Sequence, residues 1–186
     1  MVGSSRGPEA VRAALIEAAT DLFARDGDAS VRAVAARAGV NHGLVHHYFG
    51  GKPGLRTAVI DKLATSLRHS LDVPDSSSPT VVSRAALRVT EQDPRLIKIL
   101  ARALLDGAVP EQLQTTFPVV QRLLETPSDA DAAERRAVIA EGLAMVLGTV
   151  VFGAWIRAAL GISERELDTI RTQVIDRGLA RVEGRA

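Results

Sequence analysis

Apolar residues recur at every third or fourth position along most of the chain, which is the spacing of one face of an α-helix. The first run places Val11, Leu15, Ala18 and Leu22 on one face and ends at Asp26-Gly27. Runs of β-branched residues bounded by turns, which would indicate strands, are rare. The pattern therefore predicts an all-α fold.

Residues 30–52 contain two short helical patterns separated by a sharp break. The first residue of the segment is a serine, which is a good N-cap, and Gly39 suits the left-handed turn at the end of the first helix. Asn41 is expected to cap the second helix, on which Val45 and Phe49 lie four residues apart on an inward face. This layout predicts a helix-turn-helix, whose second helix is presented to the DNA major groove.

Prolines and turn-forming residues divide the middle of the chain. A stretch rich in serine and proline at residues 73–79 predicts a loop between a helix over about residues 52–71 and a helix over residues 80–91. A further helix is expected to start at Pro110. Phe117-Pro118 should kink or break it, because proline lacks a backbone N–H and clashes with the preceding turn.

The last third of the chain predicts two long helices. The first, over residues 132–160, carries no charge through the 15 residues 142–156. A membrane span needs about 20 mostly apolar residues, so a buried helix is the preferred interpretation. The residues Ser163-Glu164-Arg165-Glu166 form a capping box, which predicts that the final helix starts there.

Four segments carry a family resemblance by their order and spacing, namely Leu22-Phe23-Ala24, Val31-Arg32-Ala33-Val34-Ala35, Ala38-Gly39-Val40 and His47-Tyr48-Phe49-Gly50-Gly51-Lys52. Together they resemble the N-terminal domain of the tetracycline-repressor (TetR) family of bacterial transcriptional regulators, over about residues 11–59. The resemblance implies about nine helices. They would form a three-helix DNA-binding domain over residues 1–51 and a helical ligand-binding and dimerisation domain over residues 52–186.

The resemblance also assigns roles to residues of the helix-turn-helix. The positions implied to read base edges are His42, Gly43, Leu44 and His46. The positions implied to contact phosphates are Ser30, Arg32, His47, Tyr48 and Lys52. Residues 41–70 carry four Lys or Arg against one Asp, a local net charge of +3, while the whole chain carries only +1. A local basic patch of this kind is what phosphate contact requires.

One departure from the family pattern keeps an alternative open. Between Phe23 and Val31 the chain is about two residues shorter than family members usually are, which affects the placement of the second helix on DNA. The alternative function is a helical small-molecule-binding or scaffolding protein with a degenerate DNA-reading head.

Two further classes of site are disfavoured. His42 and His46 have the i, i+4 spacing of zinc ligands, but the intervening glutamate of hydrolytic zinc sites and a third ligand are missing. The chain has no cysteine, and no phosphate-binding loop, nucleophile elbow or paired-carboxylate motif is present. We therefore expect no metal, no cofactor and no enzymatic activity.

The resemblance implies a homodimeric repressor of a near-palindromic DNA operator, which a small-molecule effector would release. Dimerisation would use the two C-terminal helices, and the protein would be cytoplasmic, because no signal peptide is visible. Large apolar residues expected to line the effector pocket are Leu104, Phe117, Met145, Phe152 and Trp155.

Overall fold

The computed structural model describes residues 7–27, 29–126 and 130–183. Within these residues the chain forms α-helices and no strand, as the apolar spacing predicts. The helices run over Pro8–Asp26 (α1), Val31–Ala38 (α2), Gly43–Phe49 (α3), Lys52–His69 (α4), Pro79–Gln92 (α5), Arg95–Leu105 (α6), Pro110–Leu113 (α7), Pro118–Glu125 (α8), Ala132–Leu160 (α9) and Glu164–Val182 (α10).

The predicted helix boundaries are confirmed at several points. The loop before Pro79, the break at Phe117-Pro118 and the start of α9 all lie where the sequence indicates. The Ser163 capping box is present in full, with the backbone N–H of Ser163 donating to Glu166 at 2.7 Å and the N–H of Glu166 donating to Ser163 at 3.2 Å.

The chain divides into two compact units, each assembled from two stretches of sequence. The first contains the described residues up to Leu63 together with Lys98–Thr116, and the second contains Ala64–Ile97 together with the described residues from Phe117 onward. Helix α4 contributes to both units. The two units do not divide at residue 51, where the DNA-binding domain is expected to end. That expected boundary separates two functions and not two compact units, so it stays a prediction.

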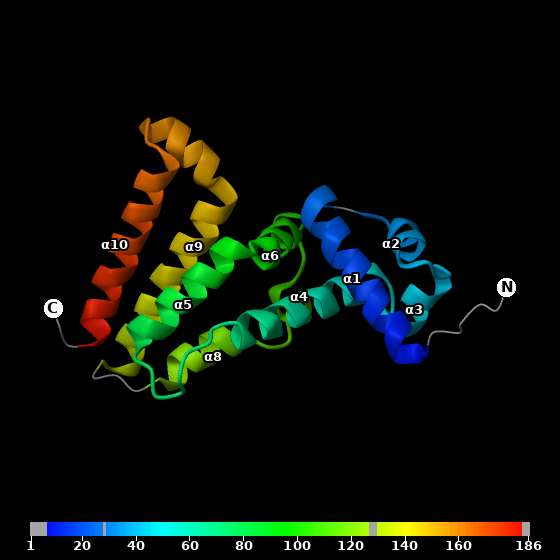
Figure 1. Cartoon of the computed structure of the whole chain (residues 1–186), viewed down its shortest axis with the longest axis horizontal. Helices are drawn as coiled ribbons and strands as arrows, with labels where there is room; N and C mark the ends of the chain where they lie inside the picture. The colour runs from blue at the N-terminus through cyan, green and yellow to red at the C-terminus, as the bar shows by residue number, and fades with distance from the viewer. Residues whose placement is uncertain (1–6, 28, 127–129, 184–186) are drawn as a thin grey trace. The chain divides into compact units, whose positions relative to one another are not determined.

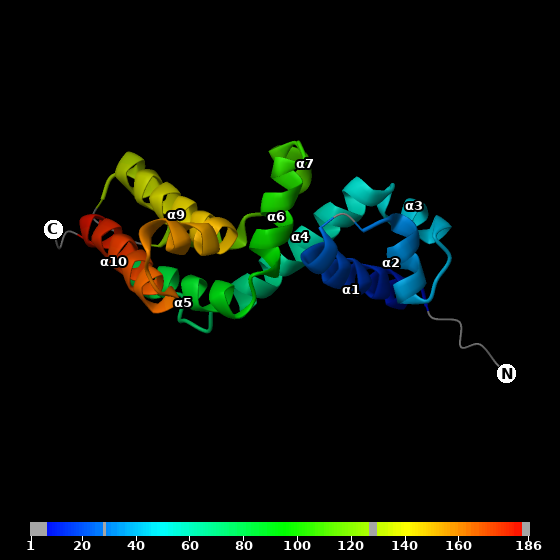
Figure 2. The same ribbon diagram turned by 90° about the horizontal axis from the view of Figure 1, so that it is seen from above.

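In the first unit, α1, α2, α3 and α4 enclose a small apolar core, and Figure 2 shows α1 beside α2. The residues without solvent exposure are Leu15, Ala19, Val34, Val45, Leu55, Val59 and Ile60. They recur at helical spacing on each element, so one apolar stripe per helix suffices to close the core. Asp61 on α4 adds a polar link, because its carboxylate accepts from the N–H and hydroxyl of Thr115 at 3.0 and 2.6 Å.

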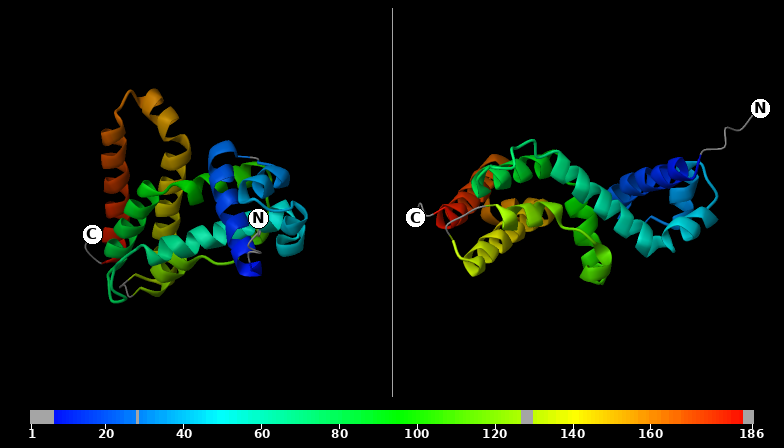
Figure 3. Two further views of the ribbon diagram at one scale, coloured as in Figure 1. Left: turned by 45° about the vertical axis from the view of Figure 1, so that its right-hand side comes forward. Right: turned by 90° about the horizontal axis from the view of Figure 1, so that it is seen from below.

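In the second unit, α9 and α10 form a hairpin whose helices lie side by side (Figures 1 and 3). Leu87 of α5 packs with Val138 of α9 and with Ile175, Leu179 and Val182 of α10. A smaller cluster joins α5 to α8 through Val82, Ala85, Val119 and Leu123. On α10 the side chains of Leu167 and Ile175 are buried, whereas Ile170 is exposed.

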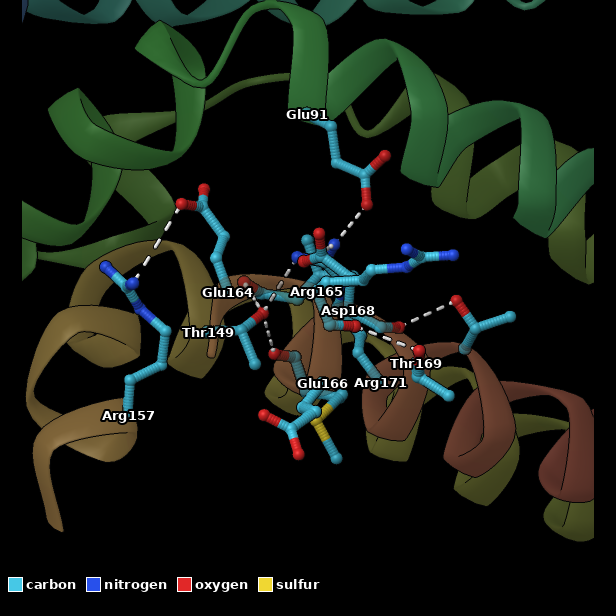
Figure 4. Close-up of polar contacts among 12 residues, drawn as sticks. Glu91, Thr149, Arg157, Glu164, Arg165, Glu166, Asp168, Thr169 and Arg171 are labelled. Atoms are coloured by element: carbon cyan, nitrogen blue, oxygen red, sulfur yellow. Dashed lines mark hydrogen bonds and ion pairs between the residues drawn. The ribbon is translucent and has the colours of Figure 1, made fainter. Parts of the chain in front are cut away.

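A buried arginine joins three helices of the second unit (Figure 4). The side chain of Arg171 on α10 is 7% exposed and forms ion pairs with Glu91 of α5 and, at 2.8 Å, with Asp168. Its other terminal nitrogen lies 3.4 Å from the hydroxyl of Thr149 on α9. A buried guanidinium is tolerated only when it is paired in this way, so loss of its partners would leave an uncompensated charge between α5, α9 and α10.

The prediction that residues 142–156 form a buried helix is wrong for the single chain. Only 11% of the most apolar window of α9 is buried, and Phe152 and Trp155 are 54% and 71% exposed. The helix is apolar around much of its circumference, while its neighbours cover only part of it. Among the described residues, α9 is also the one helix that is long and apolar enough to cross a membrane by length and composition.

Candidate nucleic-acid interface

Helix α2 is fixed at both ends by its own sequence. The hydroxyl oxygen of Ser30 accepts a hydrogen bond from the N–H of Ala33 at 3.1 Å, as the N-cap prediction requires. At the other end Gly39 has φ of +69°, and its N–H donates to the carbonyl of Ala36 at 3.2 Å. Glycine adopts this left-handed conformation without the steric cost of a side chain, so the chain leaves α2 in one defined direction.

The N-cap of α3 is His42, which makes no side-chain capping hydrogen bond, and not Asn41 as the sequence predicts. Asn41, one residue earlier, still accepts a hydrogen bond through its side-chain oxygen from the N–H of Gly43 at 2.8 Å, where α3 starts. A Cβ at Gly43 would lie 3.2 Å from this oxygen, which is tight. Gly43 therefore leaves room for the Asn41 side chain to hold the start of α3.

The faces of α3 separate as expected. Val45 is fully buried, whereas Phe49 is only half-buried, with the guanidinium of Arg12 positioned 5.4 Å from its ring centre. Of the four candidate base-reading positions, His42, Gly43 and His46 are exposed and Leu44 is half-buried. Since residues 42 and 46 are four apart, their imidazoles lie on the same side of the helix.

The candidate phosphate contacts lie around this helix. Three of them, Ser30, Arg32 and His47, are exposed, and Tyr48 and Lys52 are half-buried. The rings of His47 and Tyr48 meet edge to face with their centres 4.9 Å apart. This contact restricts both side chains at the C-terminal end of α3.

Three glycines shape the turn from α3 to α4. Gly50 and Gly51 have φ of +69° and +120°. A Cβ added at Gly54, in the first turn of α4, would overlap the carbonyl oxygen of Phe49. Sequence reasoning did not single out Gly54. The available signal was a glycine directly after Pro53 inside a predicted helix, where glycine is unfavourable unless the backbone needs the space.

The excess positive charge of the predicted basic patch is smaller than a count of charged residues in the segment indicates. Of the four Lys and Arg residues in 41–70, Lys62 forms an ion pair with Glu17, and Arg68 lies 3.6 Å from Asp75. Both carboxylates belong to residues outside the counted segment, so the local net charge of +3 overstates the excess. Among the described residues, no group of three His, Cys, Asp or Glu side chains is placed to hold a metal ion.

The large apolar residues expected to line the effector pocket are only partly covered in this chain. Leu104, Phe117, Phe152 and Trp155 are between 40% and 71% exposed, and Met145 is half-buried. Their role in an effector pocket stays a prediction. Apolar character alone does not predict burial, because burial depends on which other elements cover the helix.

Comparison with known proteins connects this geometry to a family. The model of bacterial regulatory proteins of the tetR family matches residues 15–59, which contain α2 and α3. The HTH-type transcriptional repressor Rv3405c of Mycobacterium tuberculosis is 43% identical over 175 residues, covering 91% of this chain and 88% of that protein. A second repressor, SCO4008 of Streptomyces coelicolor, is 40% identical over 75 residues, covering 39% of each chain.

Solved structures have the same fold. A TetR transcriptional regulator from Rhodococcus sp. RHA1 has a TM-score of 0.63 at 18% identity, covering 95% of this chain and 100% of that one. The transcriptional regulator SCO4942 from Streptomyces coelicolor also has a TM-score of 0.63, at 19% identity, covering 95% and 99%.

Proposed function

Because the chain belongs to the TetR family of bacterial regulatory proteins, we propose that α3 is its DNA-reading helix and that its role is repression. The protein is a DNA-binding transcriptional regulator and not an enzyme. Repression is supported by the name of the Rv3405c relative, a transcriptional repressor at 43% identity over most of the chain.

The proposed base contacts come from the exposed side of α3. His42 and His46 would meet base edges or phosphates in the major groove, and Leu44 would contact a thymine methyl group. The Ser30 cap of α2 and the Asn41 hydrogen bond at the start of α3 support this proposal because they fix the reading helix before DNA arrives. The shortened segment before Ser30 leaves the α2 cap intact, so the degenerate-head alternative has no support from this part of the chain.

The proposed phosphate contacts are Ser30, Arg32, His47, Tyr48 and Lys52. Their exposed or half-buried positions, at the start of α2, at the end of α3 and at the start of α4, support this role. Contacts of this kind set the register of a protein on the duplex and carry no sequence information themselves.

We further propose a homodimer formed through α9 and α10. The large exposed residues on these helices are Leu143, Phe152, Trp155, Leu160 and Ile170. A soluble chain rarely leaves so many apolar side chains in water, and a matching surface on a second copy would bury them. The same proposal explains why a cytoplasmic protein has a helix as long and apolar as α9. The helices of the second copy would cover its apolar side chains, so no membrane is needed.

In vitro selection from random duplex DNA tests the whole proposal. An enriched inverted repeat is expected, with two half-sites separated by a whole number of helical turns, because a two-fold dimer reads two equivalent segments. Mass measurement in detergent-free buffer should give twice the 19.7 kDa chain mass. Failure to enrich any sequence at low salt would overturn the reading-helix assignment, and a monomer would overturn the interface.

The proposed regulation is release from DNA when a small-molecule effector binds to the helices that follow the reading head. An effector acts only by binding one conformation more tightly than the other. The measurement is the dissociation rate from the selected DNA as candidate effectors are added.

A further inference from the structure

A polar pocket lies in the second unit, at the end of α4. Its volume is about 470 Å³, and it is lined by Arg68, Asp75, Pro118, Gln121, Arg122, Glu125 and Thr126. This volume lies in the range of about 300–1,000 Å³ typical of small-molecule sites. The walls are unlike the apolar lining that the sequence led us to expect, because five of the seven residues carry a charge or an amide.

Arg122 on α8 is the buried cation of this pocket. Its side chain is 8% exposed, one terminal nitrogen forms an ion pair with Asp75, and the other donates to the carbonyl oxygen of Pro74 at 2.5 Å. Its Nε is buried without a hydrogen-bond partner. A buried guanidinium requires an anion as its partner. The stability of the fold around Arg122 therefore depends on an anion at the position of the Asp75 carboxylate.

Asp75 is an unusual counter-ion for a buried arginine. Its side chain is 91% exposed, and it belongs to the loop between α4 and α5. Arg171, the other buried arginine described above, is instead paired with carboxylates on helices. A loop carboxylate that is open to solvent can be exchanged for a carboxylate from solution without unfolding a helix.

The charge around Asp75 favours its ionised form. The hydrogen bond from Arg122 holds the pKa of the Asp75 carboxyl below its ordinary value, and the charges of Arg122 and Arg68 act in the same direction. The site therefore holds a carboxylate at neutral pH.

We propose that this pocket binds a small ligand through a carboxylate group, which takes the place of Asp75 on Arg122. One terminal nitrogen of Arg122 would bind the ligand carboxylate as it now binds Asp75, while the other stays on the Pro74 carbonyl. Arg68 adds a second positive charge beside the site. Glu125 on the pocket wall disfavours a second negative group. The ligand class is therefore a monocarboxylate that also carries a hydrogen-bond donor, such as an amino or hydroxy acid.

Binding of this ligand releases the loop between α4 and α5, because Asp75 loses its ion pair. Arg68 lies on the last turn of α4, which begins at Lys52, directly after the reading helix. The identification of the ligand as an effector rests on the proposed regulatory function, whereas the binding itself does not. The two are separable by measuring binding without DNA.

The experiment uses the full chain and acetate as the probe, titrated by calorimetry and by thermal melting at ionic strength held constant with chloride. Asp75→Asn removes the carboxylate with which the chain itself pairs Arg122. Acetate should therefore bind this variant at least about tenfold more tightly than it binds the wild type, a difference that corresponds to one charge-assisted hydrogen bond. Asp72→Asn is the matched control, since it removes an exposed loop carboxylate three residues away.

Two outcomes decide the proposal. Acetate binding to Asp75→Asn that saturates, and that weakens when Arg122→Lys or Arg68→Met is added, supports it. Equal acetate effects in the wild type, Asp75→Asn and Asp72→Asn, or effects no larger than those of chloride, overturn it. The Arg68→Met arm keeps the test valid if the Arg122 variant does not fold. If acetate binds as expected but DNA binding does not change, the binding site and the proposed regulator both stand, and the role of the ligand as an effector is overturned.

Discussion

The proposed reading helix α3 and the apolar helix α9 both expose side chains to solvent, but these side chains differ in chemical character. On α3 the exposed groups are polar, and the helix is held by the hydrogen bond to Asn41 and by the glycines after Phe49. On α9 the exposed groups are apolar, and the described residues cover only a small part of its most apolar window. The first surface is complete in one chain, while the second would be completed by the second copy of the proposed dimer.

The polar surface of α3 is defined by local structure, because caps and left-handed glycines fix the helix within a few residues. The apolar surface of α9 is defined by what covers it, because the hydrophobic effect is non-directional and does not specify a partner.

The largest effect is expected from Gly54→Ala. The new Cβ would overlap the carbonyl oxygen of Phe49, so α3 and α4 must move apart. Overpacking of this kind costs about 3 kcal/mol, measured as a lower urea midpoint, and DNA affinity should fall with it. Gly142→Ala is the control, because nothing lies within 4 Å of its added Cβ and helical propensity favours alanine. Equal stability of the two variants would contradict the close approach described here.

The next effect is expected from Trp155→Glu on α9. Trp155 is 71% exposed in the chain, so the substitution should leave the monomer folded but weaken dimerisation by about 2 kcal/mol, the size of an interface hot spot. Sedimentation across a concentration series measures it. Leu105→Glu, at a residue 72% exposed on α6, is the matched control and should leave the mass unchanged. A Trp155 variant that dimerises like the wild type would remove this face from the interface.

A smaller effect distinguishes His46, within α3, from Lys52, at the start of α4. Lys52→Ala should weaken binding to all duplexes alike and reduce the slope of log affinity against log salt by about one, because one phosphate contact is lost. His46→Ala should instead change the preference among operator variants by about 1–3 kcal/mol at one position. Binding titrations at several salt concentrations measure both. A uniform loss from the His46 variant would assign it to the backbone contacts.

The smallest effect concerns the α10 cap at acidic pH. The backbone hydrogen bond from Ser163, followed by that of its hydroxyl, lowers the pKa of Glu166 below 4.5. A lowered carboxyl pKa contributes stability above the unfolded pKa, and this contribution is lost as pH falls through the folded value. Glu166→Gln should therefore flatten the loss of stability below about pH 4.5, the ordinary value. Melting curves from pH 3 to 7 measure this; unchanged slopes would contradict the capping role.

Much of the fold was predictable because its signals are local. Helical spacing gave the all-α class, Pro118 gave the break before α8, and the Ser163 box gave the start of α10. The same holds for the Ser30 cap and the turn at Gly39, which lie within four residues of the groups they satisfy. Such features depend only on residues that are close in the sequence, so they can be predicted without knowledge of the tertiary structure.

What could not be predicted depends on residues far apart in the chain. Lys62 is neutralised by Glu17, 45 positions away, so a count within one segment overstated the basic patch. The polar pocket brings Arg122 to Asp75, 47 positions away. The exposure of Trp155 follows from where the other helices end, which apolar character alone does not reveal.

The first compact unit is discontinuous, and this has a consequence for synthesis. This unit joins residues up to Leu63 to the segment Lys98–Thr116, which the ribosome makes later. At about 5–20 residues per second, the 52 residues from Ala64 to Thr115 take roughly 3–10 s to appear. During that interval α4 lacks Thr115, the partner that its Asp61 carboxylate will hold. The first unit is therefore completed only after more than half of the polypeptide has been made.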